Sequence, residues 1–170
     1  MKRLLGVFVA LIALIFVFPG CSITLDGKAI PPEMKTINIG FFDNMTPFVP
    51  DLSQKFTEAL KNRVRTTTSL SLVNGEGSAN MSGTITDFHY APISIQATNN
   101  NVAPIAGAEV LSISVRVKFV YDADKKLNFD QTFTETANFT GELSSQEQQL
   151  IQTIIPKLID DIFNKAFNNW

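Results

Sequence analysis

Reactive side chains are scarce in this sequence. Its 170 residues include one cysteine, one histidine and one tryptophan. A disulfide within the chain is therefore excluded, and so is a metal site built from several His and Cys ligands. His89 would have to serve any Ser-His-Asp or Cys-His catalytic arrangement. We interpret His89, which lies between Phe88 and Tyr90 in a predicted strand, as a structural or surface residue, and we expect no metal, no cofactor and no enzymatic activity.

The chain also lacks a surplus of basic residues. Fourteen Lys and Arg against 16 Asp and Glu give a formal net charge of −2, which argues against general nucleic-acid binding. Residues 75–77, Gly-Glu-Gly, lack the strand-to-helix context of a phosphate-binding loop. After residue 20 no apolar run is long enough to span a bilayer.

The one long apolar run is at the N-terminus. Residues 4–18 are apolar apart from Gly6 and follow Lys2 and Arg3. A basic start followed by a short apolar stretch is typical of a secretory signal. At about 1.5 Å per residue the run covers about 22 Å, which is short of the roughly 30 Å hydrocarbon core. We predict a signal peptide over residues 1–20.

The only cysteine, Cys21, follows this run directly. Gly20-Cys21 resembles a bacterial lipobox, in which the thiol is acylated and becomes the new N-terminus. Phe18 and Pro19 depart from the small residues usual in such a box, so an ordinary signal peptide with a chance cysteine is the alternative. Each acyl CH₂ buried in a bilayer contributes about 0.8 kcal/mol, so several chains would anchor the protein firmly. We predict lipid attachment at Cys21, with residues 21–35 as lipidated N-terminus and spacer.

Periodicity predicts a single α+β domain over residues 36–170. Alternating apolar residues predict strands over residues 36–41, 70–72, 79–96, 111–121 and 127–133. Apolar residues at three-four spacing predict helices over residues 51–66 and 145–168. The order β-α-β-β-β-β-α indicates a two-layer sandwich, in which two helices pack on one face of a mixed four- to five-stranded sheet.

Several details of the strands can also be predicted. A strand-helix-strand order favours a parallel arrangement of the first two strands. Residues 43–47 contain turn formers that end the first strand. The apolar parity shifts between Ile85 and Phe88, which a β-bulge near Asp87 would explain. Pro92 indicates a sheet edge or the end of a strand.

The helix termini carry recognisable signals. Residues 51–54, Asp-Leu-Ser-Gln, and residues 144–147, Ser-Ser-Gln-Glu, resemble capping boxes, in which side chains satisfy the first backbone N–H groups. Pro156 interrupts the second helix and removes one backbone hydrogen bond. We expect a kink there, tolerated because the apolar stripe on both sides is deeply buried.

The sheet face away from the helices supplies candidate contact residues. Arg116 and Lys118 are two apart on one strand and therefore project to the same side. Such a pair can engage phosphate groups, although two basic residues on a strand are also common on ordinary surfaces. The loop over residues 98–108, with Asn100 and Asn101, is a candidate for ordering by a partner; a disordered connector is the alternative.

Several separated segments form a recognisable set. They are Gly20-Cys21, residues 30–37 (IPPEMKTI), 41–44 (FFDN), 56–60 (FTEAL), 72–77 (LVNGEG) and 161–166 (DIFNKA), with Asn169-Trp170 at the end. The set resembles the LptE family of lipopolysaccharide-assembly lipoproteins, in its Bacteroidetes-type branch, and covers essentially all of the chain after the signal.

The resemblance implies a non-enzymatic outer-membrane lipoprotein. Such a protein binds, plugs and helps to assemble an LptD-like β-barrel, through which lipopolysaccharide is inserted into the outer leaflet. Some members bind lipopolysaccharide through basic residues, for which Arg116 and Lys118 are the candidates here, although this chain has no strong basic patch. Ser22 agrees with outer-membrane sorting, and the absence of an acidic cluster after Cys21 favours the periplasmic side.

Two other classes of function compete with this one. The protein could be a periplasmic accessory lipoprotein of another envelope machine, either an ABC-transporter auxiliary subunit or an activator of a cell-wall synthase. Those families also use tethered strand-helix-strand domains, so fold alone does not separate them from LptE-like proteins. A tethered hydrolase would require a cleft with a perturbed titratable group, for which the sequence supplies almost nothing.

Overall fold

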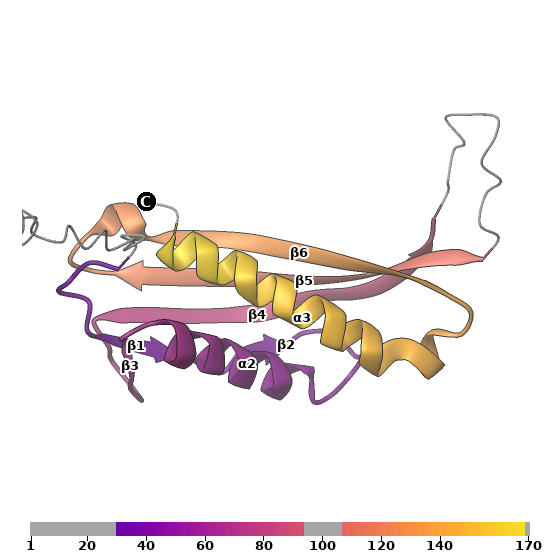
Figure 1. Cartoon of the computed structure of the whole chain (residues 1–170), viewed down its shortest axis with the longest axis horizontal. Coiled ribbons are helices and arrows are strands. Elements are labelled where there is room, and N and C mark those ends of the chain that lie inside the picture. Colours follow the sequence, from indigo (N-terminus) through magenta and orange to yellow (C-terminus); the bar gives the residue numbers. More distant parts are fainter. Residues whose placement is uncertain (1–29, 94–106, 169–170) are drawn as a thin grey trace, which may run out of the picture.

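A mixed six-stranded sheet with two helices packed against it makes up the fold (Figure 1). The computed structural model describes residues 30–93 and 107–168. The strands are β1 (Thr36–Ile39), β2 (Asp43–Asn44), β3 (Ser71–Leu72), β4 (Ala79–Pro92), β5 (Ala108–Tyr121) and β6 (Phe129–Thr140). The helices are α2 (Leu52–Thr67) and α3 (Leu143–Phe167), and a 3-10 turn, η1 (Lys125–Leu127), joins β5 to β6.

The strand order is β3-β1-β4-β5-β6, and β2 pairs with β4 beyond the end of β1. Strand β1 runs parallel to both β3 and β4, which confirms the parallel arrangement predicted for the strands on either side of the first helix. Strands β4, β5 and β6 form two long antiparallel pairs. The predicted α+β sandwich with both helices on one face is confirmed.

One strand was not expected. We predicted a turn over residues 43–47, but Asp43–Asn44 pairs in parallel with Thr84–Ile85 of β4. This two-residue strand brings the sheet to six strands, whereas four or five were predicted. A pair of residues is too short to show any periodicity, so only its position beside β4 identifies it as a strand.

The apolar stripe of α3 forms the centre of the core. All ten residues of the predicted stripe are buried, namely Leu150, Ile151, Ile154, Ile155, Leu158, Ile159, Ile162, Phe163, Ala166 and Phe167. The helix continues through Pro156, which is exposed. Proline has no backbone N–H, so the carbonyl group four residues before Pro156 lacks its helical donor. That carbonyl lies on the same, solvent-exposed side of the helix as Pro156. The kink expected at Pro156 stays a prediction.

Neither predicted capping box is formed. Asp51 precedes α2, but its side chain makes no capping hydrogen bond, and its carboxylate lies 2.7 Å from the ammonium of Lys55. Helix α3 begins at Leu143, two residues earlier than predicted, so Ser144 lies inside the helix and cannot cap it. The side-chain amide of Gln146 instead donates to the carbonyl oxygen of Thr140, at 2.6 Å, which holds the chain entering α3.

The predicted bulge in β4 is confirmed. The pairing of β4 with β5 shifts register between Ile85 and Asp87. Before the bulge Met81 and Ile85 are buried, and after it Phe88 is buried. The extra residue therefore reverses which side chains of β4 face the helices.

The core also extends ahead of β1. Met34, which lies in the segment we assigned to the spacer, is 3% exposed and belongs to the core cluster. The backbone N–H of Met34 donates to the carbonyl oxygen of Pro31. The chain is therefore packed against the domain before the first strand begins. The predicted signal peptide over residues 1–20 lies outside the described residues.

Gly83 offers a test of packing between the sheet and Phe42. A Cβ at Gly83 would overlap the carbonyl oxygen of Arg116 and the ring of Phe42, which is fully buried. We expect Gly83→Ala to lower the free energy of unfolding by about 1–3 kcal/mol, seen as a fall in Tm of roughly 2–4 °C for each kcal/mol. Gly40→Ala is the control, since its Cβ would lie 3.6 Å from the nearest atom. Equal thermal stability of the two variants would contradict this packing.

Candidate functional site

The sheet face not covered by the helices is polar, and its charged residues are Asp43, Asp87, Arg116, Lys118 and Asp130. By strand alternation and register, it presents mainly hydroxyl and amide side chains, namely Asn38, Asn80, Ser82, Thr84, Ser112, Ser114, Thr132, Thr134, Thr136 and Asn138. Most of these side chains are exposed or half-buried, but Ser112 and Ser114 are buried. The hydroxyls of Ser114 and Thr134 are 2.8 Å apart, so neighbouring strands satisfy each other's polar groups.

Arg116 and Lys118 lie on this face, as predicted. Together with Phe41, Asp43, Ser82 and Asp130 they line a shallow hollow of about 370 Å³, so two carboxylates lie beside the two cations. The guanidinium of Arg116 donates two hydrogen bonds to the carboxylate of Asp130 on β6, from Nε at 2.7 Å and from Nη2 at 3.0 Å. One of the two nominated cations is therefore already paired.

The pairing shifts the pKa of both partners. The hydrogen bond from Arg116 holds the pKa of Asp130 below its ordinary value, and the same bond raises the pKa of Arg116. Both side chains are largely exposed, so water and salt screen the pair and its contribution to stability is small. The hollow carries Lys118 as its remaining cation.

The other nominated residues cannot be placed. Cys21, Asn100 and Asn101 lie outside the described residues. His89 is placed, and it lies on the surface as expected. Its Nδ1 is 2.6 Å from the carboxylate of Asp87, with both side chains about half exposed.

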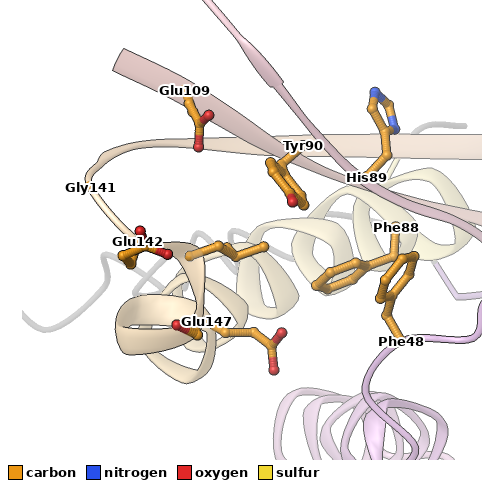
Figure 2. A pocket seen from close by; sticks show the side chains of 10 residues that line it. Phe48, Phe88, His89, Tyr90, Glu109, Gly141, Glu142 and Glu147 are labelled. Carbon is orange, nitrogen blue, oxygen red and sulfur yellow. The ribbon is translucent and has the colours of Figure 1, made fainter. Parts of the chain in front are cut away.

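A second hollow lies on the helix side of the sheet, and sequence reasoning missed it (Figure 2). It measures about 570 Å³ between the C-terminal end of β4 and the start of α3. We call it the aromatic pocket, lined by Phe48, Phe88, His89, Tyr90, Glu109, Gly141, Glu142, Leu143, Ser144 and Glu147. The ring of His89 points away from Phe88, to the opposite side of β4 (Figure 2). The one feature of the sequence that could have indicated this pocket is Phe48. It is an aromatic residue in a proline-flanked turn, and it belongs to no periodic apolar pattern that would place it in the core.

Two further observations limit what these hollows can hold. Among residues 30–93 and 107–168, no group of three or more His, Cys, Asp or Glu side chains is arranged to hold a metal ion. Within the same ranges, no helix is both long enough and apolar enough to cross a membrane.

Comparison with known proteins identifies the family. The model of the LptE family, described as lipopolysaccharide-assembly, matches residues 34–166. The chain belongs to the LptE family, whose members are non-enzymatic envelope lipoproteins of lipopolysaccharide assembly. No curated protein sequence matches the chain significantly.

Two solved structures share the fold. A crystallised protein from Xanthomonas campestris is 8% identical and aligns over 79% of this chain and 88% of its own, with a TM-score of 0.53. The uncharacterized lipoprotein B from Nitrosomonas europaea is 13% identical and aligns over 76% of this chain and 79% of its own, with a TM-score of 0.50. At these identities the likeness concerns the fold alone.

The pair between Arg116 and Asp130 predicts a measurable titration. In Arg116→Gln the pKa of Asp130 should rise towards its ordinary value, because the hydrogen bond that lowers it most is lost. The pair stabilises the fold above the ordinary carboxyl pKa, and that contribution is lost as the pH falls through the lowered pKa. An NMR titration of the Asp130 carboxyl carbon measures the change.

Lys118→Gln is the matched control for this titration. Lys118 lowers the pKa of Asp130 through space only and is the smallest of its causes. The control should therefore move the midpoint less than Arg116→Gln does. An unchanged midpoint in Arg116→Gln would mean that the pair does not form in solution.

Proposed function

We propose that this protein is an outer-membrane lipoprotein, anchored through acyl chains on Cys21, that binds and plugs an LptD-like β-barrel. It helps that barrel to assemble and to insert lipopolysaccharide into the outer leaflet, and it faces the periplasm. Membership of the LptE family supports this proposal. The structural feature that carries it is the uncovered face of the sheet.

The chemistry of that face suits the inside of a barrel. Its exposed groups are mostly hydroxyls and amides, and its Arg116 is neutralised by Asp130. The interior of an outer-membrane barrel is polar, whereas its outside is apolar. A face made mainly of hydroxyls and amides can contact such a wall with few charges to bury, and Asp43, Asp87 and Lys118 are the charged groups outside the Arg116–Asp130 pair.

The dimensions also suit a plug. The 14-residue strands β4 and β5 are roughly 46 Å long at about 3.3 Å per residue. Five strands at a spacing of about 4.8 Å are about 19 Å across, and a helix layer adds about 10 Å of thickness. Barrels of about 22 strands are wide enough to contain a plug, so the long axis of this domain would lie along the axis of the barrel.

The direct contact with lipopolysaccharide is a separate part of the proposal. Lys118, beside Arg116 in the shallow hollow, is the cation best placed to meet a phosphate group. Asp130 competes for Arg116, so we assign the larger share of any phosphate contact to Lys118. Asn100 and Asn101 are proposed as further partner contacts.

The barrel interaction is tested by detergent extraction of the full-length protein from outer membranes, followed by affinity capture. We expect a stoichiometric, heat-modifiable β-barrel of LptD size to stay bound. Thr136→Arg, which adds a charge to the exposed part of the uncovered face, should reduce barrel recovery. Gln152→Arg, on the exposed side of α3, is the matched control. Recovery of transporter or cell-wall synthase subunits without a barrel would overturn the proposal.

The anchor is tested by substitution of Cys21. We expect Cys21→Ala to remove the acyl modification, detected by mass spectrometry of the N-terminal peptide, because the thiol is the group that is acylated. The variant should also lose the firm membrane association that several acyl chains confer. Ser22→Ala, which keeps the thiol, should behave as the parent does. An acylated Cys21→Ala protein would rule out this attachment site.

A further inference from the structure

One edge of β4 is open next to the aromatic pocket. On that edge β1 pairs with β4 as far as Met81, and β2 pairs with it at Thr84–Ile85. In the part of the chain that the structure describes, no strand pairs with this edge beyond Ile85, while β5 continues along the opposite edge to Pro92. An open edge is a template on which an extended peptide can add as a further strand.

Two exposed aromatic rings stand beside this edge. Phe48 is 49% exposed and Tyr90 is 51% exposed, which is unusual for large apolar side chains in this domain. Each of these two rings packs against a second aromatic ring. Phe48 stacks on Phe88 with ring centroids 5.7 Å apart, and Tyr90 packs edge-on against Phe139 at 6.4 Å.

The turn that carries Phe48 is held in place by Asn44. The side-chain amide of Asn44 donates to the carbonyl oxygens of Phe48 and Val49, and its oxygen accepts from the backbone N–H of Thr46. Val49 adopts a φ of 49°, a conformation that a β-branched residue rarely takes. Because this geometry is fixed before any partner arrives, binding there requires little ordering of the site.

The charge of the pocket selects the kind of partner. Glu109, Glu142 and Glu147 line it, and none of the three forms an ion pair within the described ranges. Their negative charge opposes an anionic lipid headgroup, and it opposes a second copy of this chain that would bring the same carboxylates. The three are also not arranged to hold a metal ion.

We propose that the aromatic pocket and the open edge of β4 together form a docking site for an extended, basic peptide segment of a partner protein. The backbone of the segment pairs with β4 between Asp87 and Ala91. A Lys or Arg side chain enters the pocket, where its stem covers Tyr90 and Phe48 and its charge meets the carboxylates. This proposal rests on the proposed function in one respect only. The partner protein that supplies the segment is taken to be the LptD-like barrel.

The position of the site supports this assignment. Helix α3 begins at the end of the sheet where β4 ends, opposite the end where β1 begins (Figure 1). The described chain enters the domain ahead of β1, so the pocket lies at the end of the domain away from that entry point. A partner segment can therefore reach the pocket without approaching the end at which the predicted tether joins the domain.

The test uses the purified protein from Cys21 onward and two synthetic hexapeptides. In one peptide Arg alternates with Val, and in the other Glu replaces Arg. We expect the Arg peptide to shift the amide NMR signals of Asp87 to Ala91 and of Glu109, and its affinity to fall as salt screens the charges. The Glu peptide should leave these signals unchanged. Equal binding of both peptides, signal changes confined to other elements, or no binding of the Arg peptide would overturn the proposal.

Matched variants test whether the carboxylates of the pocket contribute to the binding of the Arg peptide. The double variant Glu142→Lys/Glu147→Lys should weaken binding of the Arg peptide on the order of tenfold. Glu76→Lys, an exposed site in the turn before β4, should not change it. Because positive charge at the start of α3 can destabilise the helix, Glu142→Gln/Glu147→Gln, checked by circular dichroism, must weaken binding in the same direction. An unchanged affinity in the folded Gln variant would also overturn the proposal.

The peptide test and the barrel capture can contradict the two proposals separately. A protein that captures the barrel but ignores the Arg peptide would retain the proposed function and lose the docking site. A protein that binds the Arg peptide at β4 but captures no barrel would retain the docking site and lose the barrel as its source.

Discussion

The burial of one sheet face beneath α3 is the constraint on which the rest of the structure depends. Each large apolar side chain buried there contributes roughly 1.5–3 kcal/mol, and α3 buries nine of them besides Ala166. A proline inside a regular helix costs about 3 kcal/mol through the lost hydrogen bond and the clash of its ring, so the burial of the stripe outweighs the cost of Pro156. Because both helices pack on the same face, the polar groups of the opposite face form hydrogen bonds with one another, with water or with a partner.

The bulge in β4 determines what the strand presents at its far end. Ahead of it, Met81 and Ile85 face the helices; after it, Phe88 and Tyr90 do, while Asp87 and His89 face outward. Without the extra residue, Asp87 would point under the helices, where an unpaired carboxylate is costly. The same shift places Tyr90 at the edge of the aromatic pocket. The bulge therefore keeps Asp87 out of the core and also positions one of the residues that line the pocket.

Charge is distributed differently over the two hollows. On the uncovered face, Arg116 pairs with Asp130 across neighbouring strands, and Lys118, Asp43 and Asp87 add charges of both signs. In the aromatic pocket, the start of α3 contributes Glu142 and Glu147 to a hollow that Glu109 of β5 also lines. Only Glu142, at the N-cap position of α3, lies where the helix N-terminus favours a carboxylate, since the first turn of the helix contains no acidic residue. A polar face with charges of both signs and an acidic aromatic pocket suit two different contacts on one molecule.

The sequence by itself determined the two helices, the four longer strands and the reversal of parity near Asp87, because each is written in a local period of apolar residues. It also carried the set of segments that resembles the LptE family, which the match over residues 34–166 confirmed. Only the tertiary structure decided that Asp43–Asn44 is a strand, that Arg116 meets Asp130, and that Phe48, Tyr90 and Glu142 share a pocket. These depend on strand register and on how loops far apart in the chain are packed together, and no local period encodes either.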